Sequence, residues 1–547
     1  MTSDKFDHMT GEFLRDFLRI HPDVGTFIGI HAPYDWQLPN GGFKKLEDTR
    51  NLLGFWYNKM KEFETSDELS LDQKLSVRTL KLAMDSHEFS MVDYPVWKMN
   101  PDGIDLPGST FFVMLTREYA PFDQRVSAMT SRMKRLPKYL NEFRSRFDNS
   151  QPVKEWTQLA KESAEQFPGF LKFIDAAAKQ KVHDSLADDL TSAVKEAESA
   201  LEEHVDWLDK LLEGPFAKFP MGKRKFAKLI KLRGLGLMPS EILSLGETYL
   251  KSFKEERVKV AEKIAPGKGV EGAMEVVRAK CGKTFEEALS MTEEEMNKAK
   301  QYIIEKDIAT VDPHAVLRVV ETPSFLASLL PYAALFQPAV FDPVQEGIYV
   351  VTRPKDPKDL GSHLNRAAII NTAVHEAYPG HFHQDVAANK RHWMLQIAAG
   401  GDTAMATETI EGWAHYCEKM MFDRGYEATD EAAFEMLNGA IWRACRIVAD
   451  VKLAQGEATI LDMTEFMVKE IGMTRDATEK EVLRYTHTPS QALSYMIGRH
   501  LILEFRKELE TKMGANFNEK RFHDLVASYG LLPFALMKEA VVAGLGA

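Results

Sequence analysis

A long one-sided apolar stripe between residues 184 and 213 constrains the fold more than any other stretch of this sequence. Its apolar positions recur every three or four residues, at Leu186, Leu190, Val194, Ala197, Leu201, Val205, Leu208 and Leu212. This spacing puts them on one face of an α-helix, which must pack against other helices. Gly214-Pro215 ends the pattern. Helical patterning of the same kind covers 44–65, 69–92, 122–148, 155–181, 240–265, 403–424, 434–455 and 476–506.

Strand-like patterning is scarce by comparison. The best candidate is 347–354, which is rich in β-branched and aromatic residues and is bounded by glycine and proline. It predicts either an edge strand that binds an extended substrate through main-chain hydrogen bonds or a small hairpin that covers the core. Thr292-Glu293-Glu294-Glu295 is typical of a capping box and predicts a helix from there to about residue 312. We expect an all-α, mainly helical fold with strand confined to about 345–355.

The chain length of 547 residues is too great for one small core and predicts a protein of two lobes. The break at Gly214-Pro215 suggests an N-terminal helical lobe, 1–215, and a second helical lobe, 216–547. The two could equally form one continuous two-lobed domain. A net charge of −12 argues against nucleic acid and anionic membranes as partners.

Three cysteines are too few for a disulfide framework and are typical of a reducing compartment. The first residues lack the basic and then apolar pattern of a signal peptide. One uncharged run, 322–341, reaches membrane-spanning length, but it contains three prolines and is expected to be a buried irregular segment. These features predict a cytoplasmic protein.

The residues that point to chemistry are His375-Glu376-Ala377-Tyr378-Pro379-Gly380-His381 and, further along, Glu411. Two imidazoles and one carboxylate form a common ligand set for catalytic zinc, with water in the fourth position. The glutamate beside the first histidine would then act as general base on that water. We therefore expect Zn²⁺ to be bound by His375, His381 and Glu411, with Glu376 as the catalytic base.

The spacing of the two histidines is unusual. In His-Glu-x-x-His the two ligands are four positions apart and share one helical face. Here they are six positions apart, which in a continuous helix means about 600° of rotation and about 9 Å of rise. Pro379-Gly380 lies between them, and proline interrupts a helix. The motif therefore requires a helix that is bulged or broken there, and His383 is the alternative ligand to His381.

Glu411 lies 30 residues after His381, which is enough for a turn and an antiparallel helix that returns to the same place. Gly412 follows it and permits two backbones to approach closely. A charged side chain between Ile410 and Trp413 is costly to bury unless it is paired or bound to metal.

These motifs, with others along the chain, resemble the family catalogued as domain of unknown function 885. The matching residues are 375–381, Glu411-Gly412-Trp413-Ala414, Arg484-Tyr485, Pro489-Ser490-Gln491, Tyr495, Gly498, Gly29-Ile30-His31, Tyr34-Asp35, Leu38-Pro39 and Glu321-Thr322-Pro323. They extend over nearly the whole chain. The family is similar to the helical gluzincin metallopeptidases, such as thimet oligopeptidase and the thermostable carboxypeptidases.

The resemblance implies a large two-lobed helical body with a deep cleft and a small β-element beside the metal. It also implies that His375, His381 and Glu411 bind zinc and that Glu376 is the base. The chain departs from the family at Ser490, where the family more often has glycine.

Several other polar residues are candidates for the site. Tyr485 or Tyr495 could donate a hydrogen bond to the oxyanion that forms when water attacks a carbonyl. Arginines could bind a substrate carboxylate, although ion pairs between helices would account for them as well. The candidates for contacting substrate are Arg446, Arg484, Arg499 and Tyr349. The candidates for orienting a ligand imidazole are His415, Asp385 and Glu408.

The function that these residues favour is a zinc-dependent metallopeptidase that hydrolyses peptides bound in a cleft. Two alternatives stay open. One is a zinc-dependent amidohydrolase that acts on a non-peptide metabolite, and the other is a non-catalytic helical scaffold or binding protein. The expected partner is a peptide or a small amide substrate, and the sequence indicates no oligomeric state.

Overall fold

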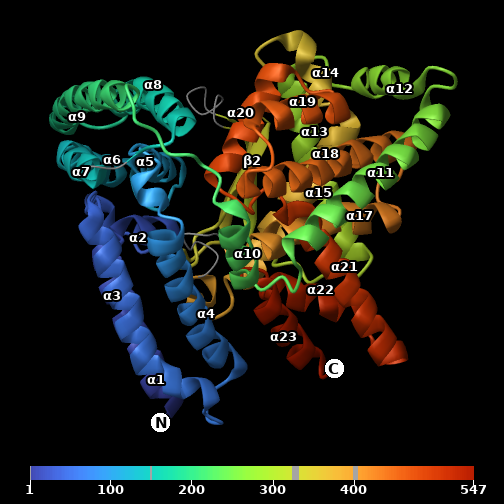
Figure 1. Ribbon diagram of the computed structural model, residues 1–547, viewed down its shortest axis with the longest axis horizontal. Helices are drawn as coiled ribbons and strands as arrows, with labels where there is room; N and C mark the ends of the chain where they lie inside the picture. Colours follow the sequence, from blue (N-terminus) through green and yellow to red (C-terminus); the bar gives the residue numbers. More distant parts are fainter. Residues whose placement is uncertain (1, 148–150, 323–329, 331, 398–404) are drawn as a thin grey trace. The chain divides into compact units, whose positions relative to one another are not determined.

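The structure, a computed structural model, describes the chain except residues 1, 148–150, 323–329, 331 and 398–404 (Figure 1). The chain divides into two compact units. The first comprises Met1–Phe219 with Ala339–Pro343, and the second comprises Pro220–Pro338 with Val344–Ala547. The sequence placed one boundary, after residue 215, and did not anticipate that 339–343 packs with the N-terminal unit. The cleft that the resemblance implies stays a prediction.

All the regular elements in the described part of the first unit are helices. Its stripe between 184 and 213 forms α9, whose apolar face buries Leu190, Leu201 and Leu208. In sequence its helices are α1 Thr2–Ile20, α2 Pro22–Ile28, α3 Phe43–Met60, α4 Leu71–Glu88, α5 Asp105–Thr116, α6 Phe122–Met133, α7 Leu136–Arg144, α8 Lys154–Lys179 and α9 Asp184–Leu211.

The second unit combines helices with one small sheet, so the predicted all-α fold with a minor β-element is confirmed. Its helices are α10 Gly222–Leu232, α11 Pro239–Ile264, α12 Gly269–Arg278, α13 Phe285–Glu305, α14 Leu360–His363, α15 Arg366–Glu376, α16 His381–Ala388, α17 Thr407–Asp423, α18 Asp430–Gln455, α19 Ile460–Ile471, α20 Arg475–His487, α21 Ser494–Met513, α22 Glu519–Ser528 and α23 Phe534–Leu545. No described helix is both long and apolar enough to cross a membrane.

The sheet has three strands in the order β1-β3-β2. They are β1 Val316–Glu321, β2 Ala333–Phe336 and β3 Glu346–Val351. The predicted strand is β3, but the edge-strand alternative for it is wrong, because β1 pairs with it in parallel and β2 pairs with it antiparallel. The uncharged run 322–341 contains β2, while 323–329 and 331 lie outside the described residues.

Three predicted helices have different boundaries from those expected. The stretch 122–148 divides into α6 and α7. Thr292 is not an N-cap. Its hydroxyl donates to the carbonyl of Ala288 inside α13 at 2.9 Å, and the cap is Thr284, which accepts from the backbone N–H of Glu287. The stretch 476–506 is interrupted between α20 and α21, where Pro489 lies. A sequence pattern shows helical periodicity but does not reveal which of several polar residues forms the cap.

Two glycines allow α17 and α21 to touch through their backbones. A Cβ on Gly412 would lie 2.4 Å from the carbonyl carbon of Gly498, and a Cβ on Gly498 would lie 2.0 Å from the carbonyl oxygen of Glu408. Only a residue without a side chain permits this approach. The expectation that Gly412 permits close packing is confirmed, and its partner is the glycine of a later motif.

We predict that Gly498→Ala destabilises the protein by at least about 1–3 kcal/mol, because the new methyl group must push α17 and α21 apart. Thermal unfolding measures the effect. The matched control is Gly54→Ala in α3, where a Cβ meets nothing within 4 Å. That change should be neutral or stabilise by about 0.4–1 kcal/mol. Equal unfolding temperatures for the two variants would contradict the packing argument.

Candidate metal centre

The break between the two histidines of the motif is confirmed. α15 ends at Glu376, and α16 begins at His381. Between them the chain folds back over the last turn of α15, so that the N–H of Gly380 donates to the carbonyl of Val374 at 3.1 Å. A Cβ on Gly380 would lie 1.8 Å from the carbonyl oxygen of His375. Glycine is therefore required at this position, and the reversal brings His381 back to His375.

The two histidines and Glu411 converge on one point. The Oε2 atom of Glu411 lies 3.7 Å from His375 Nε2 and 3.3 Å from His381 Nε2. The two imidazole rings are 4.7 Å apart at 88°. Zinc with bonds of about 2.1 Å in tetrahedral geometry separates its ligand atoms by about 3.4 Å. These three donors therefore fit zinc, and among the described residues they form the one such cluster of three.

Protonation of the three groups follows from their proximity. Burial lowers the pKa of His375, but its hydrogen bonds to Glu411 and Glu418 outweigh this effect and raise the pKa to about 9. Burial also lowers the pKa of His381, but the nearby carboxylate of Glu411 outweighs this effect and raises it. The two imidazoles in turn hold the pKa of Glu411 well below its usual range, against the effect of burial. The centre thus favours a positive charge between its ligands, which a divalent cation would provide.

A second carboxylate, Glu418, orients the first ligand from behind. His375 Nδ1 lies 2.7 Å from its Oε1 atom, and Asn371 donates to its Oε2 atom at 3.1 Å. Arg443 donates to Oε1 at 2.9 Å, and His415 Nδ1 is 3.3 Å from Oε2. The side chain is fully buried, and Arg443 is the strongest influence holding its pKa well below its usual range against burial. A ligand imidazole that is hydrogen-bonded in this way has a fixed orientation and tautomer.

The sequence interpretation missed Glu418 and Arg443 as partners of His375. Glu418 lies seven residues after Glu411 on α17, so both carboxylates share one helical face. This spacing was visible in the sequence. Glu408, which was a candidate for orienting an imidazole, instead forms a buried ion pair with Arg233, whose Nη2 is 2.7 Å from its Oε2.

Glu376 lies beside the centre and is not engaged elsewhere. Its negative charge contributes to raising the pKa values of His375, His381 and Tyr349, so its carboxylate is close to all three. Within the described part of the chain it makes no hydrogen bond or ion pair.

His383 and Asp385 follow His381 on α16. His383 stands apart from the three converging donors; burial lowers its pKa to about 4, and its Nε2 has no hydrogen-bond partner among the described residues. Burial raises the pKa of Asp385 to about 7, and the attraction of His381 opposes that rise. Asp385 therefore stays a candidate for interacting with that ligand.

The two candidate tyrosines differ in how they are held. The Tyr485 hydroxyl donates to Glu481 at 2.9 Å and accepts from Arg446 at 3.1 Å, and the side chain is 1% exposed. Tyr495 is half-buried. Burial raises its pKa most, and the negative charge of Glu411 raises it next, so its hydroxyl lies near the metal ligands. Of the two, Tyr495 is the one placed to face a reacting group.

The candidate substrate-binding residues are mostly occupied by internal contacts. Arg446 and Arg484 both donate to Oε1 of Glu481, at 2.5 and 2.9 Å. Tyr349, on β3, is 1% exposed and packs in the core with Phe285 and Ile369. These contacts account for Arg446, Arg484 and Tyr349 without a substrate. The fourth candidate, Arg499, has its Nη1 atom 3.3 Å from His415 Nε2.

Ser490 occupies a position that favours glycine. Its φ of 76° is in the left-handed region. Its hydroxyl accepts from Arg233 Nη1 at 2.7 Å, and its N–H donates to Asp450 at 2.9 Å. The hydroxyl thus adds a hydrogen bond to the Arg233–Glu408 ion pair, which a glycine would not make.

Comparison with known proteins supports the fold. A family model described as bacterial protein of unknown function (DUF885) matches residues 22–541. A putative lipoprotein from Colwellia psychrerythraea has a similar structure, with a TM-score of 0.83, 19% identity and 99% of both chains covered. A putative lipoprotein of unknown function from Shewanella oneidensis has a TM-score of 0.77 and 22% identity, covering 98% of this chain and 99% of its own. No functionally curated protein shows significant similarity.

The predicted cytoplasmic location is contradicted, because both of these structural relatives are described as lipoproteins. The low cysteine count was one of the features from which this location was predicted. A chain that is stabilised by a large apolar core does not need disulfides in any compartment. A low cysteine count therefore does not identify the compartment of such a protein. Of the three free cysteines, Cys417 and Cys445 are buried.

We predict that Glu418→Gln lowers the affinity for zinc roughly 10- to 100-fold, because the amide cannot hold the imidazole of His375 with a full negative charge. A competition titration with a chelating dye measures the affinity. The matched control is Glu295→Gln, which removes another buried carboxylate, one that pairs with Lys298 at 2.7 Å in α13. The control should lower the unfolding temperature and leave zinc affinity unchanged. Equal zinc affinities for both variants would contradict the orienting role.

We also predict that His381→Ala prevents stoichiometric binding of zinc, because two remaining ligands are too few for a stable site. The matched control is His383→Ala, which removes an imidazole two positions away on the same helix. Elemental analysis of both purified variants should show metal in the control alone. Retention of one zinc equivalent by His381→Ala, with its loss from His383→Ala, would reverse the assignment.

Proposed function

The chain belongs to the DUF885 family of bacterial proteins, and we propose, from its site alone, that it is a zinc-dependent metallopeptidase. The observation that carries the proposal is the convergence of His375, His381 and Glu411 beside an unengaged Glu376. Two histidines, one carboxylate and a free neighbouring carboxylate are the groups that zinc-assisted hydrolysis of an amide needs. A kinship with gluzincin peptidases is part of the same proposal.

The metal would be held by one nitrogen of each histidine and one oxygen of Glu411, which leaves a position for water. Bound zinc would supply a Lewis acid that polarises a carbonyl and lowers the pKa of water to about 7. Glu418 keeps the His375 imidazole fixed through its Nδ1 atom. Arg443, at 2.9 Å from Glu418, balances the second buried carboxylate, so that Glu411 alone contributes negative charge to the ligand set.

Glu376 accepts a proton from the attacking water at a carboxylate oxygen and transfers it to the nitrogen of the leaving amine. Tyr495 donates its hydroxyl proton in a hydrogen bond to the oxygen of the tetrahedral intermediate. The guanidinium of Arg446 lies 4.7 Å from the centre of the Tyr495 ring, which helps to fix the ring in place. Tyr485 has a supporting role in this scheme, because it orders Arg446 and Glu481 rather than facing the reaction.

We predict that Glu376→Gln folds, retains zinc and still binds peptide, but loses at least about two orders of magnitude in turnover. The amide preserves the shape of the side chain and cannot accept the proton. Zinc content, unfolding temperature and hydrolysis of a peptide library should be measured on one preparation. A merely structural Glu376 would instead lower stability and leave turnover per folded molecule unchanged. Wild-type hydrolysis by a zinc-loaded Gln variant would refute the mechanism.

A further inference from the structure

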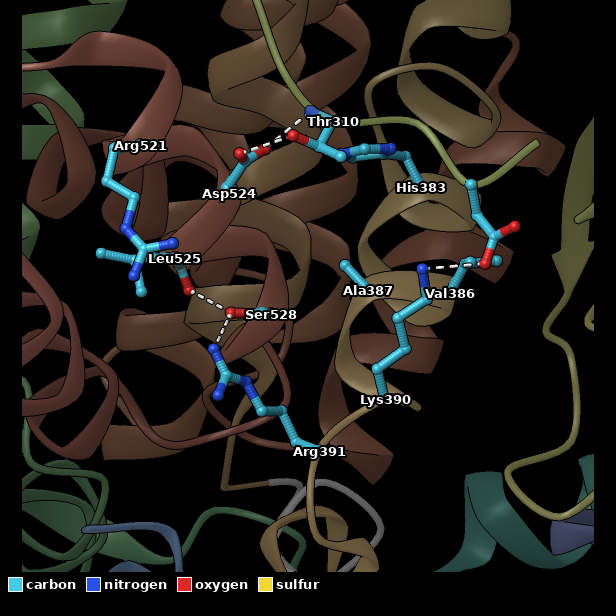
Figure 2. Close-up of a pocket in the computed structure, with 11 residues that line it drawn as sticks. Thr310, His383, Val386, Ala387, Lys390, Arg391, Arg521, Asp524, Leu525 and Ser528 are labelled. Atoms are coloured by element: carbon cyan, nitrogen blue, oxygen red, sulfur yellow. Dashed lines mark hydrogen bonds and ion pairs between the residues drawn. The ribbon is translucent and has the colours of Figure 1, made fainter. Parts of the chain in front are cut away.

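A polar cavity lies in the same unit as the metal centre, on the reverse face of α16. His383, Val386 and Ala387 of α16 line it, together with Lys390 just beyond the end of the helix. His381 precedes His383 by two positions, or about 200° around the helix, so the metal ligand and the cavity occupy opposite faces. α22 provides the other wall, from which Arg521, Asp524, Leu525 and Ser528 line the cavity (Figure 2). The cavity holds about 390 Å³.

Positive charge exceeds negative charge around this cavity. Lys390, Arg391 and Arg521 line it, together with Asp312 and Asp524. The surplus stands out in a chain whose net charge is −12. A local surplus of cationic groups in a cavity attracts anions.

Both carboxylates are engaged by the protein itself. Asp312 pairs with Lys390 at 2.8 Å. Asp524 accepts from the backbone N–H and the hydroxyl of Thr310, at 2.7 and 2.8 Å (Figure 2).

The two arginines stand at different places in the cavity wall. Arg391 donates to the hydroxyl of Ser528 at 3.1 Å and lies 4.2 Å from the centre of the Tyr529 ring, contacts that hold its guanidinium in position. Arg521 is exposed, and its guanidinium makes no hydrogen bond or ion pair within the described residues. A planar guanidinium of this kind matches a carboxylate or phosphate group through two parallel hydrogen bonds.

His383 adds an unpaired polar atom to the wall. Its side chain is 4% exposed, and its Nε2 has no partner in the described part of the chain. A buried polar atom without a hydrogen bond costs free energy, so such atoms in native structures commonly mark a site for water or a ligand. Figure 2 shows the imidazole at the same end of the view as Thr310, with Arg391 at the opposite end.

From these features we propose that the cavity between α16 and α22 binds a small molecule through a carboxylate or phosphate group. Arg521 and Arg391 bind the anionic group, and His383 Nε2 hydrogen-bonds a second polar atom of the ligand. Val386, Ala387 and Leu525 provide an apolar wall for a short carbon chain. The volume is that of a site for a metabolite-sized ligand. This site is distinct from the metal centre and does not depend on the proposed peptidase activity.

Isothermal titration calorimetry of the full chain tests the proposal with two probes, inorganic phosphate and acetate, at constant ionic strength maintained with potassium chloride. We expect saturable binding of at least one probe. Arg521→Gln should weaken it roughly tenfold to a hundredfold, because a charge-assisted hydrogen-bond pair is lost. Since Arg521 is exposed, this change should leave the unfolding temperature unaltered. The probe that binds more tightly identifies the anionic group.

The matched control is Arg475→Gln, which removes an arginine with 59% side-chain exposure at the start of α20. It should bind the probes like the wild type. Arg391→Gln provides a second test within the cavity and should also weaken binding. Failure of both probes to bind, or equal affinities for Arg521→Gln and Arg475→Gln, would overturn the proposal.

Discussion

The candidate site depends on one backbone contact, in which Gly380 packs directly against the carbonyl of His375. Without it a continuous helix would carry His381 about 9 Å along its axis and out of reach of His375. The reversal is anchored from outside by α17, because Trp413 Nε1 donates to the carbonyl of Pro379 at 2.8 Å. The helix that supplies Glu411 thus also holds the turn that positions His381.

The position of α17 depends in turn on α21, since Gly412 and Gly498 let the two helix backbones touch. This contact brings the start of α21, with Tyr495, close to Glu411. Buried charges reinforce the arrangement. Glu418 pairs with Arg443, and Glu408 pairs with Arg233. Each pair is costly to desolvate and would be more costly to break, so both fix the relative positions of their helices.

Residue patterns predicted the parts of this arrangement that depend on local chemistry. Pro379-Gly380 between two histidines indicated a broken helix, and the helix does break there. The sequence did not reveal which strands and side chains far apart in the chain pair with one another. The expectation that strand is confined to about 345–355 is wrong, since β1 and β2 lie outside that range. Both pair with β3, and the short β2 has no alternating pattern of its own. Likewise, the sequence suggested Asp385 and Glu408 as carboxylate partners of a ligand imidazole and missed Glu418, because burial and neighbouring charges select the partner.

The sequence by itself determined the helical class, the broken motif and the set of residues from which a metal centre could be built, because periodicity, proline and glycine act through local backbone geometry. Only the tertiary structure decided which polar side chains meet. It joined Glu418 to His375, engaged Tyr485, Arg446 and Arg484 with Glu481, and turned His383 toward a separate cavity. These pairings connect residues on different helices, and they follow from the packing of those helices, which no local pattern specifies.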